Sequence, residues 1–337
     1  MQPENSSVCD VREVLKYQDS KFLHYSELIM LILSFIALPI LILAIVKCIK
    51  SSLFHTNIRL ITGFHCFFIL IHCFGRILQH SSDMYLWMAP LAVCEKRQYF
   101  EICVISRSMY LYGIYSSSFT TVFMAIERTL ATYLSHKYEH KNSCVGILLV
   151  CFQIIISLLI TVPLFLDSKF TTRPDFCEFH DPSDWLLVVE IFTIFSNFVA
   201  FLQCWKLYRV NTKLRVHSKV RRLSQKYQIE ENKMLIKVIL RFTCLDFVFM
   251  MVYCFGNLAT NFIDFSLSQG KLHGFIEMVH CLPVYAIVVT YSMARVIKHI
   301  QKRKTSNLVA EIRIREDAYF SYINNQWTRD TKNKSHK

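Results

Sequence analysis

The chain has 337 residues, 53% of them hydrophobic, and only seven glycines and seven prolines. A soluble domain would have to bury several long, uninterrupted apolar runs in one core, so this composition favours a membrane protein. The formal net charge of +13 would suggest nucleic-acid binding on a soluble domain, but the positions of the basic residues along the chain argue against it.

The amino-terminal segment, residues 1–27, is polar and of mixed charge. This pattern predicts no cleavable signal peptide, so the first membrane span would act as its own signal anchor. The segment contains Asn5-Ser6-Ser7, a sequon for N-glycosylation. Asn5 is therefore a candidate glycosylation site in an extracellular segment.

Seven windows are apolar and long enough to cross a bilayer. They are residues 28–46, 60–78, 104–126, 144–166, 185–205, 238–263 and 275–294. Because the backbone must satisfy its own hydrogen bonds in lipid, these windows predict helices. The expected fold class is an all-α membrane protein with a seven-transmembrane bundle over residues 28–298 and a basic cytoplasmic tail over residues 299–337.

The distribution of lysine and arginine predicts the orientation of the bundle. The loop between the fourth and fifth windows is rich in aspartate and glutamate, whereas the opposite set of loops holds a dense basic block between Lys206 and Lys226 and a basic tail from Arg295. By the positive-inside rule the amino terminus lies outside and the carboxyl terminus inside. The positive charge is then mostly a topology signal, assisted by acidic lipid headgroups.

The third window combines polar and aromatic residues in its first half with an abrupt end at Glu127-Arg128. Tyrosines and the triplet Ser116-Ser117-Ser118 are a poor choice for a helix surrounded by lipid. We therefore expect this helix to sit inside the bundle, against other helices.

Ionisable groups inside membrane spans cost free energy and are functional candidates. The candidate ligand-binding residues, all expected in the outer half, are Tyr110, Tyr115, Glu190, Tyr253, Glu277 and His280. The alternative is structural: Glu277 reaches the interface and Glu190 bonds to a neighbouring helix. Asp246 lies deep enough in the sixth span to need a partner.

The chain shows no motif of an enzyme or of a metal site. There is no HExxH or GxSxG sequence and no phosphate-binding glycine loop. His65 and His72 share one helix face, which suggests either buried histidines bonded to neighbouring helices or metal ligands that need further donors. The seventh span lacks a lysine for a retinal Schiff base, which excludes a photoreceptor. We expect no enzyme activity, no cofactor and no metal.

The thirteen cysteines are scattered, and most lie inside apolar runs. Cys103, at the start of the third span, can reach Cys177 in the acidic loop, where an oxidising environment permits a disulfide. Cys94 is a competing partner, and Cys9 could take whichever cysteine is left. The sequence leaves this connectivity open.

Four stretches of the sequence are distinctive. They are Tyr99-Phe100-Glu101-Ile102-Cys103 with Arg107, Ile126-Glu127-Arg128 with Ala131-Thr132-Tyr133 and Tyr138-Glu139, Leu223-Ser224 with Tyr227-Gln228-Ile229-Glu230-Glu231-Asn232, and Tyr319-Phe320 with Trp327. With these stretches and seven predicted spans, the chain resembles a G-protein-coupled receptor, and in particular the nematode serpentine chemoreceptors of class epsilon (Sre). It departs from the rhodopsin-like class, because Glu127-Arg128-Thr129 replaces Asp-Arg-Tyr and the seventh span has no Asn-Pro-x-x-Tyr.

The resemblance implies a chemosensory receptor in the plasma membrane of sensory neurons or their cilia. Its expected partners are an unknown small molecule, a heterotrimeric G protein and membrane lipids, and not nucleic acid. By position, the G-protein-facing candidates are Glu127, Arg128, Arg221, Arg222 and Tyr227.

Two other functions remain open at this stage. A seven-span channel or carrier would need polar groups continuous through the membrane, whereas here they gather in the outer half and at the inner end. A peptide or transmitter receptor of the same fold would differ only in its ligand.

Overall fold

In the described part of the protein all regular elements are helices. The computed structural model describes residues 11–50, 55–133, 144–166, 177, 184–217, 223–262 and 268–334. The long helices are α2 (Lys21–Lys50), α3 (Thr56–Met88), α4 (Phe100–Tyr133), α6 (Cys144–Leu166), α7 (Asp184–His217), α8 (Leu223–Phe262) and α10 (Leu282–Lys334). The short ones are α1 (Val11–Gln18), the 3-10 helix η1 (Val93–Lys96) and α9 (Gln269–Val279).

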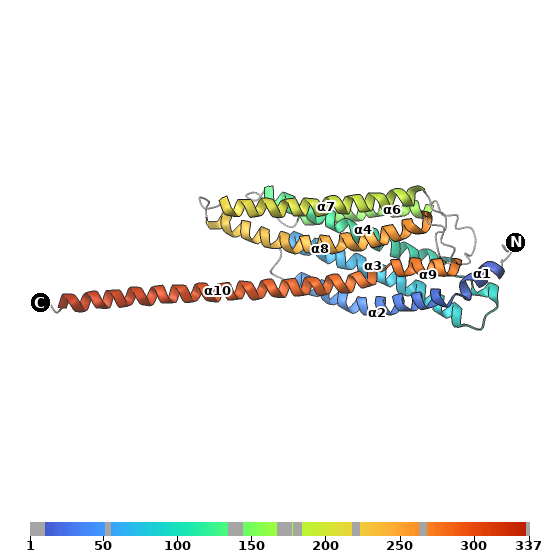
Figure 1. Cartoon of the computed structure of the whole chain (residues 1–337), viewed down its shortest axis with the longest axis horizontal. Coiled ribbons are helices and arrows are strands. Elements are labelled where there is room, and N and C mark those ends of the chain that lie inside the picture. Colours follow the sequence, from blue (N-terminus) through green and yellow to red (C-terminus); the bar gives the residue numbers. More distant parts are fainter. Residues whose placement is uncertain are drawn as a thin grey trace. The chain divides into compact units, whose positions relative to one another are not determined.

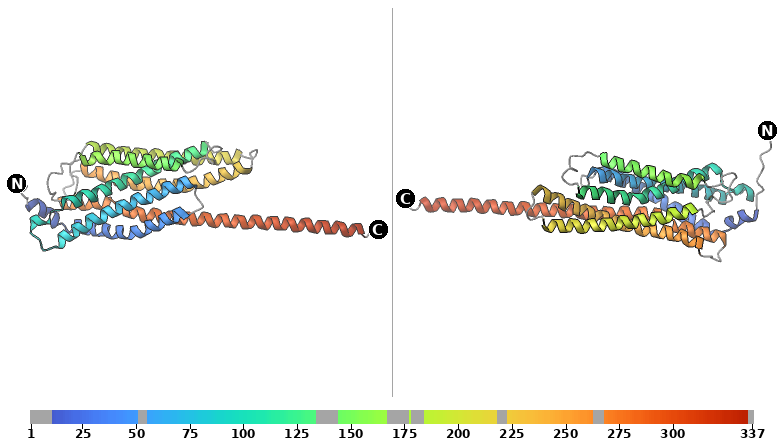
Figure 2. Two further views of the ribbon diagram at one scale, coloured as in Figure 1. Left: turned by 180° about the vertical axis from the view of Figure 1, so that it is seen from behind. Right: turned by 90° about the horizontal axis from the view of Figure 1, so that it is seen from above.

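The chain divides into two compact units, Met1–Thr290 and Tyr291–Lys337. In the first unit the long helices lie side by side along a common direction, as two further views also show (Figures 1 and 2). The second unit is the continuation of α10, a helix in which Arg295 stacks over the ring of Tyr291 at 4.9 Å.

Length and hydropathy mark five stretches as able to cross a membrane: α2, α3, most of α6 and α7, and Gln269–Lys302. With α4 and α8, the helices form the predicted all-α, seven-span fold class. Large apolar side chains such as Leu43, Leu159 and Phe195 are more than half exposed, as expected for side chains that face lipid rather than water.

Helix α4 occupies the centre of the bundle. It packs against α3, α6, α7 and α8, and most of its residues are buried, including Ser116, Ser117 and Ser118. Its contact with α3 is close, because a Cβ atom on Gly113 would lie only 2.7 Å from the backbone of His72. The prediction that this polar helix sits inside the bundle is confirmed.

The seventh predicted span, residues 275–294, is not one continuous helix. Helix α9 ends at Val279 and α10 begins at Leu282, with Pro283 at its second position. Proline has no backbone N–H and is favoured in the first turn of a helix, where Pro283 lies in α10, and this is consistent with a break at His280 and Cys281. The last carbonyl groups of α9 are therefore left without helical partners.

Candidate functional site

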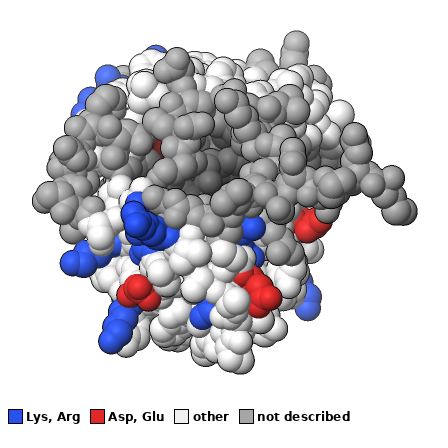
Figure 3. Space-filling view, turned by 90° about the vertical axis from the view of Figure 1, so that its right-hand side faces the viewer, with Lys and Arg blue, Asp and Glu red and all other residues white. Residues whose placement is uncertain are grey.

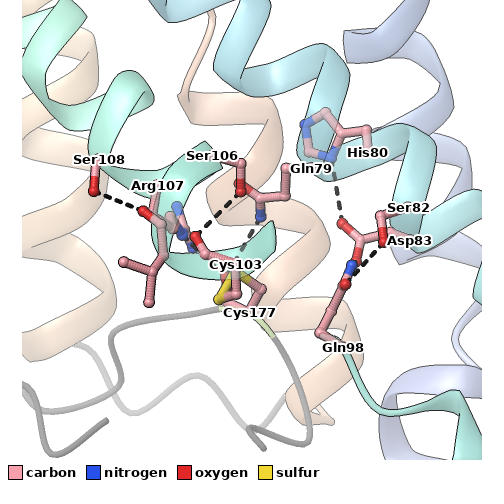
Figure 4. The surroundings of a disulfide bond; sticks show 11 residues. Gln79, His80, Ser82, Asp83, Gln98, Cys103, Ser106, Arg107, Ser108 and Cys177 are labelled. Atoms are coloured by element: carbon pink, nitrogen blue, oxygen red, sulfur yellow. Dashed lines mark hydrogen bonds and ion pairs between the residues drawn. A yellow bond between two sulfur atoms is a disulfide. The ribbon is translucent and has the colours of Figure 1, made fainter. Parts of the chain in front are cut away.

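A disulfide holds one end of the bundle together. Cys103, in the first turn of α4, is bonded to Cys177, with the two Cα atoms 5.5 Å apart. The carbonyl oxygen of Cys177 accepts hydrogen bonds from Arg107 Nε at 3.0 Å and from Gln79 Nε2 at 3.4 Å (Figure 4). We call this the disulfide end. Cys94 is also disulfide-bonded, and Cys9 lies outside the described residues.

The surface at the disulfide end is mixed in charge. Figure 3 looks onto the end of the bundle that carries α1 and η1, where the described basic and acidic side chains are interspersed with uncharged ones. The opposite end of α4 is marked by Glu127 and Arg128, and we call it the Glu127 end.

Arg76, from the middle of α3, is fully buried and joins α3 to the break in the seventh span. Its guanidinium forms an ion pair with Glu277 and donates to the carbonyl oxygens of Glu277 at 3.4 Å and His280 at 3.0 Å. It also lies 4.9 Å from the ring centroid of Tyr110. Arg76 thus satisfies the carbonyl groups that the helix break exposes, while Glu277 balances its charge.

Most of the predicted ligand-binding residues come together beside this ion pair. Tyr110 and Tyr253 pack on His280, with ring centroids 5.5 Å and 5.0 Å away. Tyr115 is fully buried and lies near Glu190 and Tyr253. The six candidates therefore form one buried cluster from α4, α7, α8 and α9, although the carboxylate of Glu277 is already engaged by Arg76.

Asn257 of α8 connects the acidic and aromatic parts of this cluster. Its side chain donates to Glu190 Oε1 at 2.8 Å and lies 2.8 Å from Nε2 of His280. The buried polar atoms in and near this cluster that have no hydrogen-bond partner in the described part of the protein include Glu190 Oε2, Thr193 Oγ1 and His280 Nδ1. Buried polar groups without partners are rare, and a bound molecule is one thing that satisfies them.

A second polar chain runs through the middle of the bundle. His65 Nδ1 donates to the carbonyl oxygen of Ser117, 3.2 Å away, and its Nε2 lies 3.0 Å from the hydroxyl of Tyr285. Asp246 of α8 lies close to Tyr285, and the two side chains interact electrostatically. A carbonyl oxygen only accepts, so His65 Nδ1 carries a proton. Asp246 thus has the partner that its depth requires, and His65 is a helix-linking histidine.

His72 has the same structural role one level closer to the disulfide end, because its Nδ1 lies 3.0 Å from the carbonyl oxygen of Tyr110. Polar contacts also cross the centre of the bundle: Asn197 of α7 bonds to Ser118 and Thr121, and Gln153 of α6 bonds to Thr120. The polar groups are therefore less confined to the two ends of the bundle than the sequence suggested.

At the Glu127 end, Glu127 and Arg128 are both buried and form an ion pair with each other. Arg128 also donates to Asn232 Oδ1 of α8, at 3.3 Å. Gln203 of α7 donates to Thr129 at 3.1 Å. Asn232 belongs to the Tyr227–Asn232 stretch that carried much of the family resemblance, so that stretch includes the residue that contacts Arg128.

Several predicted site residues cannot be placed in the same way. Asn5, Arg221 and Arg222 lie outside the described residues. Tyr227 lies within α8, but its side chain is outside the described part.

Sequence reasoning missed Arg76, Asn257 and Asn232. Arg76 offered a usable signal, because an arginine in the interior of an apolar window needs an acidic partner, and Glu277 is the acidic residue in the seventh window. Asn257 and Asn232 are neutral and have no spacing that distinguishes them.

Comparison with known proteins places these features in a family. Residues 8–328 match the family model of the serpentine type 7TM GPCR receptor class ab chemoreceptors. The chain is similar to serpentine receptor class beta-16 of Caenorhabditis elegans, with 26% identity over 83% of this chain and 85% of the relative. Serpentine receptor class beta-3 of the same organism is 24% identical over 96% of both chains.

A further relative, serpentine receptor class alpha/beta-14 of the same organism, is 23% identical over 76% of this chain and 68% of its own length. These matches correct one prediction. The broader assignment to the serpentine chemoreceptors is confirmed, but class epsilon is not supported, since the family model and the relatives point to classes ab and beta. The motifs quoted from the sequence do not discriminate between classes of this family.

Proposed function

The chain belongs to the serpentine class ab chemoreceptors, a family of seven-transmembrane G-protein-coupled receptors, and we propose that it binds a small molecule in the half of its bundle that carries the disulfide. Family membership makes it a chemosensory receptor and a multi-pass membrane protein. Coupling to a G protein and detection of small molecules are general properties of such receptors.

The observation that carries the proposal is the buried cluster around Asn257. Glu190 and His280 both bond to this asparagine, yet each keeps one polar atom without a partner in the described part of the chain. Tyr110 and Tyr253 supply aromatic walls on the same histidine. A few convergent polar groups among aromatic side chains are typical of small-molecule sites.

This chemistry favours a small ligand with an apolar or aromatic body and a hydrogen-bonding group that reaches Glu190. Glu277 would position Arg76 and His280 rather than contact the ligand, because its carboxylate is taken up by the ion pair. The ligand contacts proposed are therefore Tyr110, Tyr115, Glu190, Tyr253 and His280.

We propose that the signal leaves at the Glu127 end, where Glu127, Arg128, Arg221, Arg222 and Tyr227 would face a heterotrimeric G protein. A ligand that prefers one arrangement of the helices shifts the population toward it. Separation of α8 from α4 would break the bond from Arg128 to Asn232 and expose the arginine, the kind of local rearrangement through which helical switches act.

The orientation that fits this proposal has the amino terminus outside the cell, in the plasma membrane of a sensory neuron or its cilium. Asn5 would then be glycosylated. Glycosidase treatment of the expressed receptor should increase its electrophoretic mobility, and Asn5→Gln should abolish that change. A carboxyl-terminal tag that antibodies reach on intact cells would overturn the orientation.

The direct test is a screen of volatile and water-soluble odorants on cells that express the receptor, with a second-messenger readout. Once an agonist is found, Glu190→Gln should weaken its potency about tenfold or more, the loss expected for one hydrogen bond to a charged group. Unchanged potency in this variant would exclude Glu190 as a ligand contact.

The same assay tests the signalling end. Arg128→Ala should abolish the response while surface expression persists, because the ion pair of Arg128 is with its neighbour Glu127 and its contact with another helix is one hydrogen bond to Asn232. Arg241→Ala, which removes an exposed arginine of α8, is the matched control and should respond normally. Equal responses from both variants would remove Arg128 from the proposed mechanism, and an agonist-evoked ion current that needs no G protein would favour the channel alternative.

A further inference from the structure

Three side chains near the disulfide end converge, and in the described part of the protein no hydrogen bond joins them to one another. Glu27 comes from α2, and His80 and Asp83 lie one turn apart on α3. One ligand-type atom from each lies within 4.8 Å of those from the other two. All three residues are at least nine-tenths buried, with exposed fractions of 1%, 0% and 7%.

In each of these three side chains, one polar atom is bonded to a neighbour and another has no hydrogen-bond partner among the described residues. Glu27 Oε2 contacts His24 Nδ1 at 3.2 Å, and Asp83 Oδ1 accepts a hydrogen bond from Gln98. The second carboxylate oxygens, Glu27 Oε1 and Asp83 Oδ2, have no hydrogen-bond partner in the described part of the protein, nor has Nδ1 of His80. Figure 4 shows His80 directed toward Asp83 from the neighbouring turn, with Nδ1 and Oδ2 3.7 Å apart.

No lysine or arginine among the described residues forms an ion pair with Glu27 or Asp83. Arg76 is paired with Glu277, and the amine of Lys96 donates to the carbonyl oxygen of Trp87 at 3.2 Å. The two carboxylates of Glu27 and Asp83 thus share only histidines as ion-pair partners among the described residues. Two buried carboxylates without a strong cation are costly unless a proton or a metal ion neutralises them.

A small cavity adjoins the cluster. Glu27 and Asp83 line it, together with His24, Gln98 and Lys96. The cavity has room for about one water molecule or one small ion beside the carboxylates. We propose that Glu27, His80 and Asp83 form a binding site for a divalent cation, with Zn²⁺ as its preferred ligand.

The donor set supports Zn²⁺ among the divalent cations. Zinc is bound by carboxylate oxygen and imidazole nitrogen, commonly with three protein ligands and a water in the fourth position. Ca²⁺ and Mg²⁺ prefer oxygen ligands alone. Tetrahedral zinc ligands lie about 3.4 Å apart, given bonds of about 2.1 Å, so the three side chains would need to draw together only slightly.

Binding would also change the Arg76–Glu277 ion pair. His80 Nε2 now lies 3.0 Å from a guanidinium nitrogen of Arg76 and accepts a hydrogen bond from it. To ligate a metal through Nδ1, the ring must carry its own proton on Nε2. Glu277 Oε2 lies 3.6 Å from Nε2 of His80, so a small movement would let this oxygen accept a hydrogen bond from the protonated Nε2. The cation would thereby rearrange the hydrogen bonds that hold α3 to the break in the seventh span.

The test uses the full-length receptor, purified in detergent, and compares thermal unfolding in EDTA with unfolding in excess ZnCl₂. A ligand that binds only the folded state raises the unfolding temperature, so zinc should raise it by several degrees. Asp83→Asn and Glu27→Gln should remove this shift while unfolding in EDTA at the wild-type temperature or above it, because each removes one buried charge.

The matched control is Glu101→Gln, which neutralises an exposed acid in the first turn of α4. It should keep the full zinc shift. No shift in the wild type would overturn the proposal, and so would an equal shift in Asp83→Asn, since zinc would then be bound by free cysteines or surface groups. Titration calorimetry with ZnCl₂ should give an affinity reduced at least about tenfold in His80→Gln.

Discussion

Two buried arginines lie at different levels of the bundle, and each is paired with a glutamate. Arg76 pairs with Glu277, a residue 201 positions away, and also donates to two carbonyl oxygens of the broken seventh span. Arg128 pairs with Glu127, its own neighbour in sequence, and reaches another helix only through one 3.3 Å bond to Asn232.

The ion pair of Arg76 links two helices, whereas the ion pair of Arg128 lies within one helix. If α3 and α9 moved apart, Arg76 and Glu277 would each become an uncompensated buried charge. If α8 left α4, Arg128 would keep its neutralising partner and lose one hydrogen bond. The disulfide end is therefore built to hold its geometry, and the Glu127 end can move at low cost.

The largest effect should come from Arg76→Ala. The substitution leaves the carboxylate of Glu277 and two carbonyl oxygens buried without partners, which should destabilise the receptor by about 3–5 kcal/mol. Thermal unfolding of the purified receptor and its delivery to the cell surface both measure the loss. Wild-type values in this variant would contradict the claim that Arg76 fixes α3 to the broken seventh span.

The double variant Arg76→Met with Glu277→Met sharpens the same comparison. Removing both charges leaves no unpaired ion, so this receptor should be more stable than Arg76→Ala alone. Arg128→Ala serves as the counterpart at the other end. It also leaves a buried carboxylate, that of Glu127, but it leaves no backbone carbonyl oxygens of another helix unsatisfied, so it should cost less stability than Arg76→Ala.

The next effect in size is that of Cys177→Ser. It opens a disulfide that closes a loop over a sequence separation of 74 residues, and the expected loss is about 2–4 kcal/mol. It also loosens the segment whose carbonyl oxygen binds Arg107 and Gln79. Surface delivery and unfolding temperature should both fall. Unchanged values would show that the contacts of Arg76 stabilise the disulfide end even when the disulfide is absent.

The smallest effect on stability should come from Asn232→Ala, which removes one hydrogen bond worth about 1 kcal/mol. If this contact holds α8 on α4 in the resting state, basal second-messenger signalling should rise by up to about fivefold, the population change that such an energy allows.

The matched control is Asn211→Ala. Asn211 of α7 donates to Thr132 of α4 at 3.2 Å, so its loss costs a similar bond without touching Arg128. Basal signalling should stay low in this variant. A rise in both variants, or in neither, would show that the bond to Arg128 is not the contact that restrains α8.

The helices themselves were predictable, because apolar runs in lipid have to satisfy their own backbone. The interior position of α4 was predictable too, since Tyr110 and Ser116–Ser118 suit protein neighbours better than lipid. The gathering of Tyr110, Glu190, Tyr253 and His280 followed from their common depth, which the length of each span fixes.

Other features depend on contacts between residues that are far apart in the sequence, and a local sequence pattern does not reveal such contacts. The break at His280 required Arg76 to satisfy the exposed carbonyl groups, and the contact between Arg128 and Asn232 joins residues 104 positions apart. Glu27 and Asp83 come from different helices with no metal-binding spacing. Burial of a charge indicates that a partner exists, but only the packed bundle identifies the partner.

The sequence separation between Arg76 and Glu277 also affects how the protein is inserted into the membrane during synthesis. An arginine inside a membrane span costs free energy at insertion, up to about 2.5–3.5 kcal/mol at the centre of the span. The acid that pairs with Arg76 is made 201 residues later. At about 5–20 residues per second, the ribosome needs roughly 10–40 seconds to reach that acid. During this interval the newly inserted α3 carries an unneutralised arginine, so the nascent chain is exposed to membrane chaperones and quality-control proteases until its last span emerges.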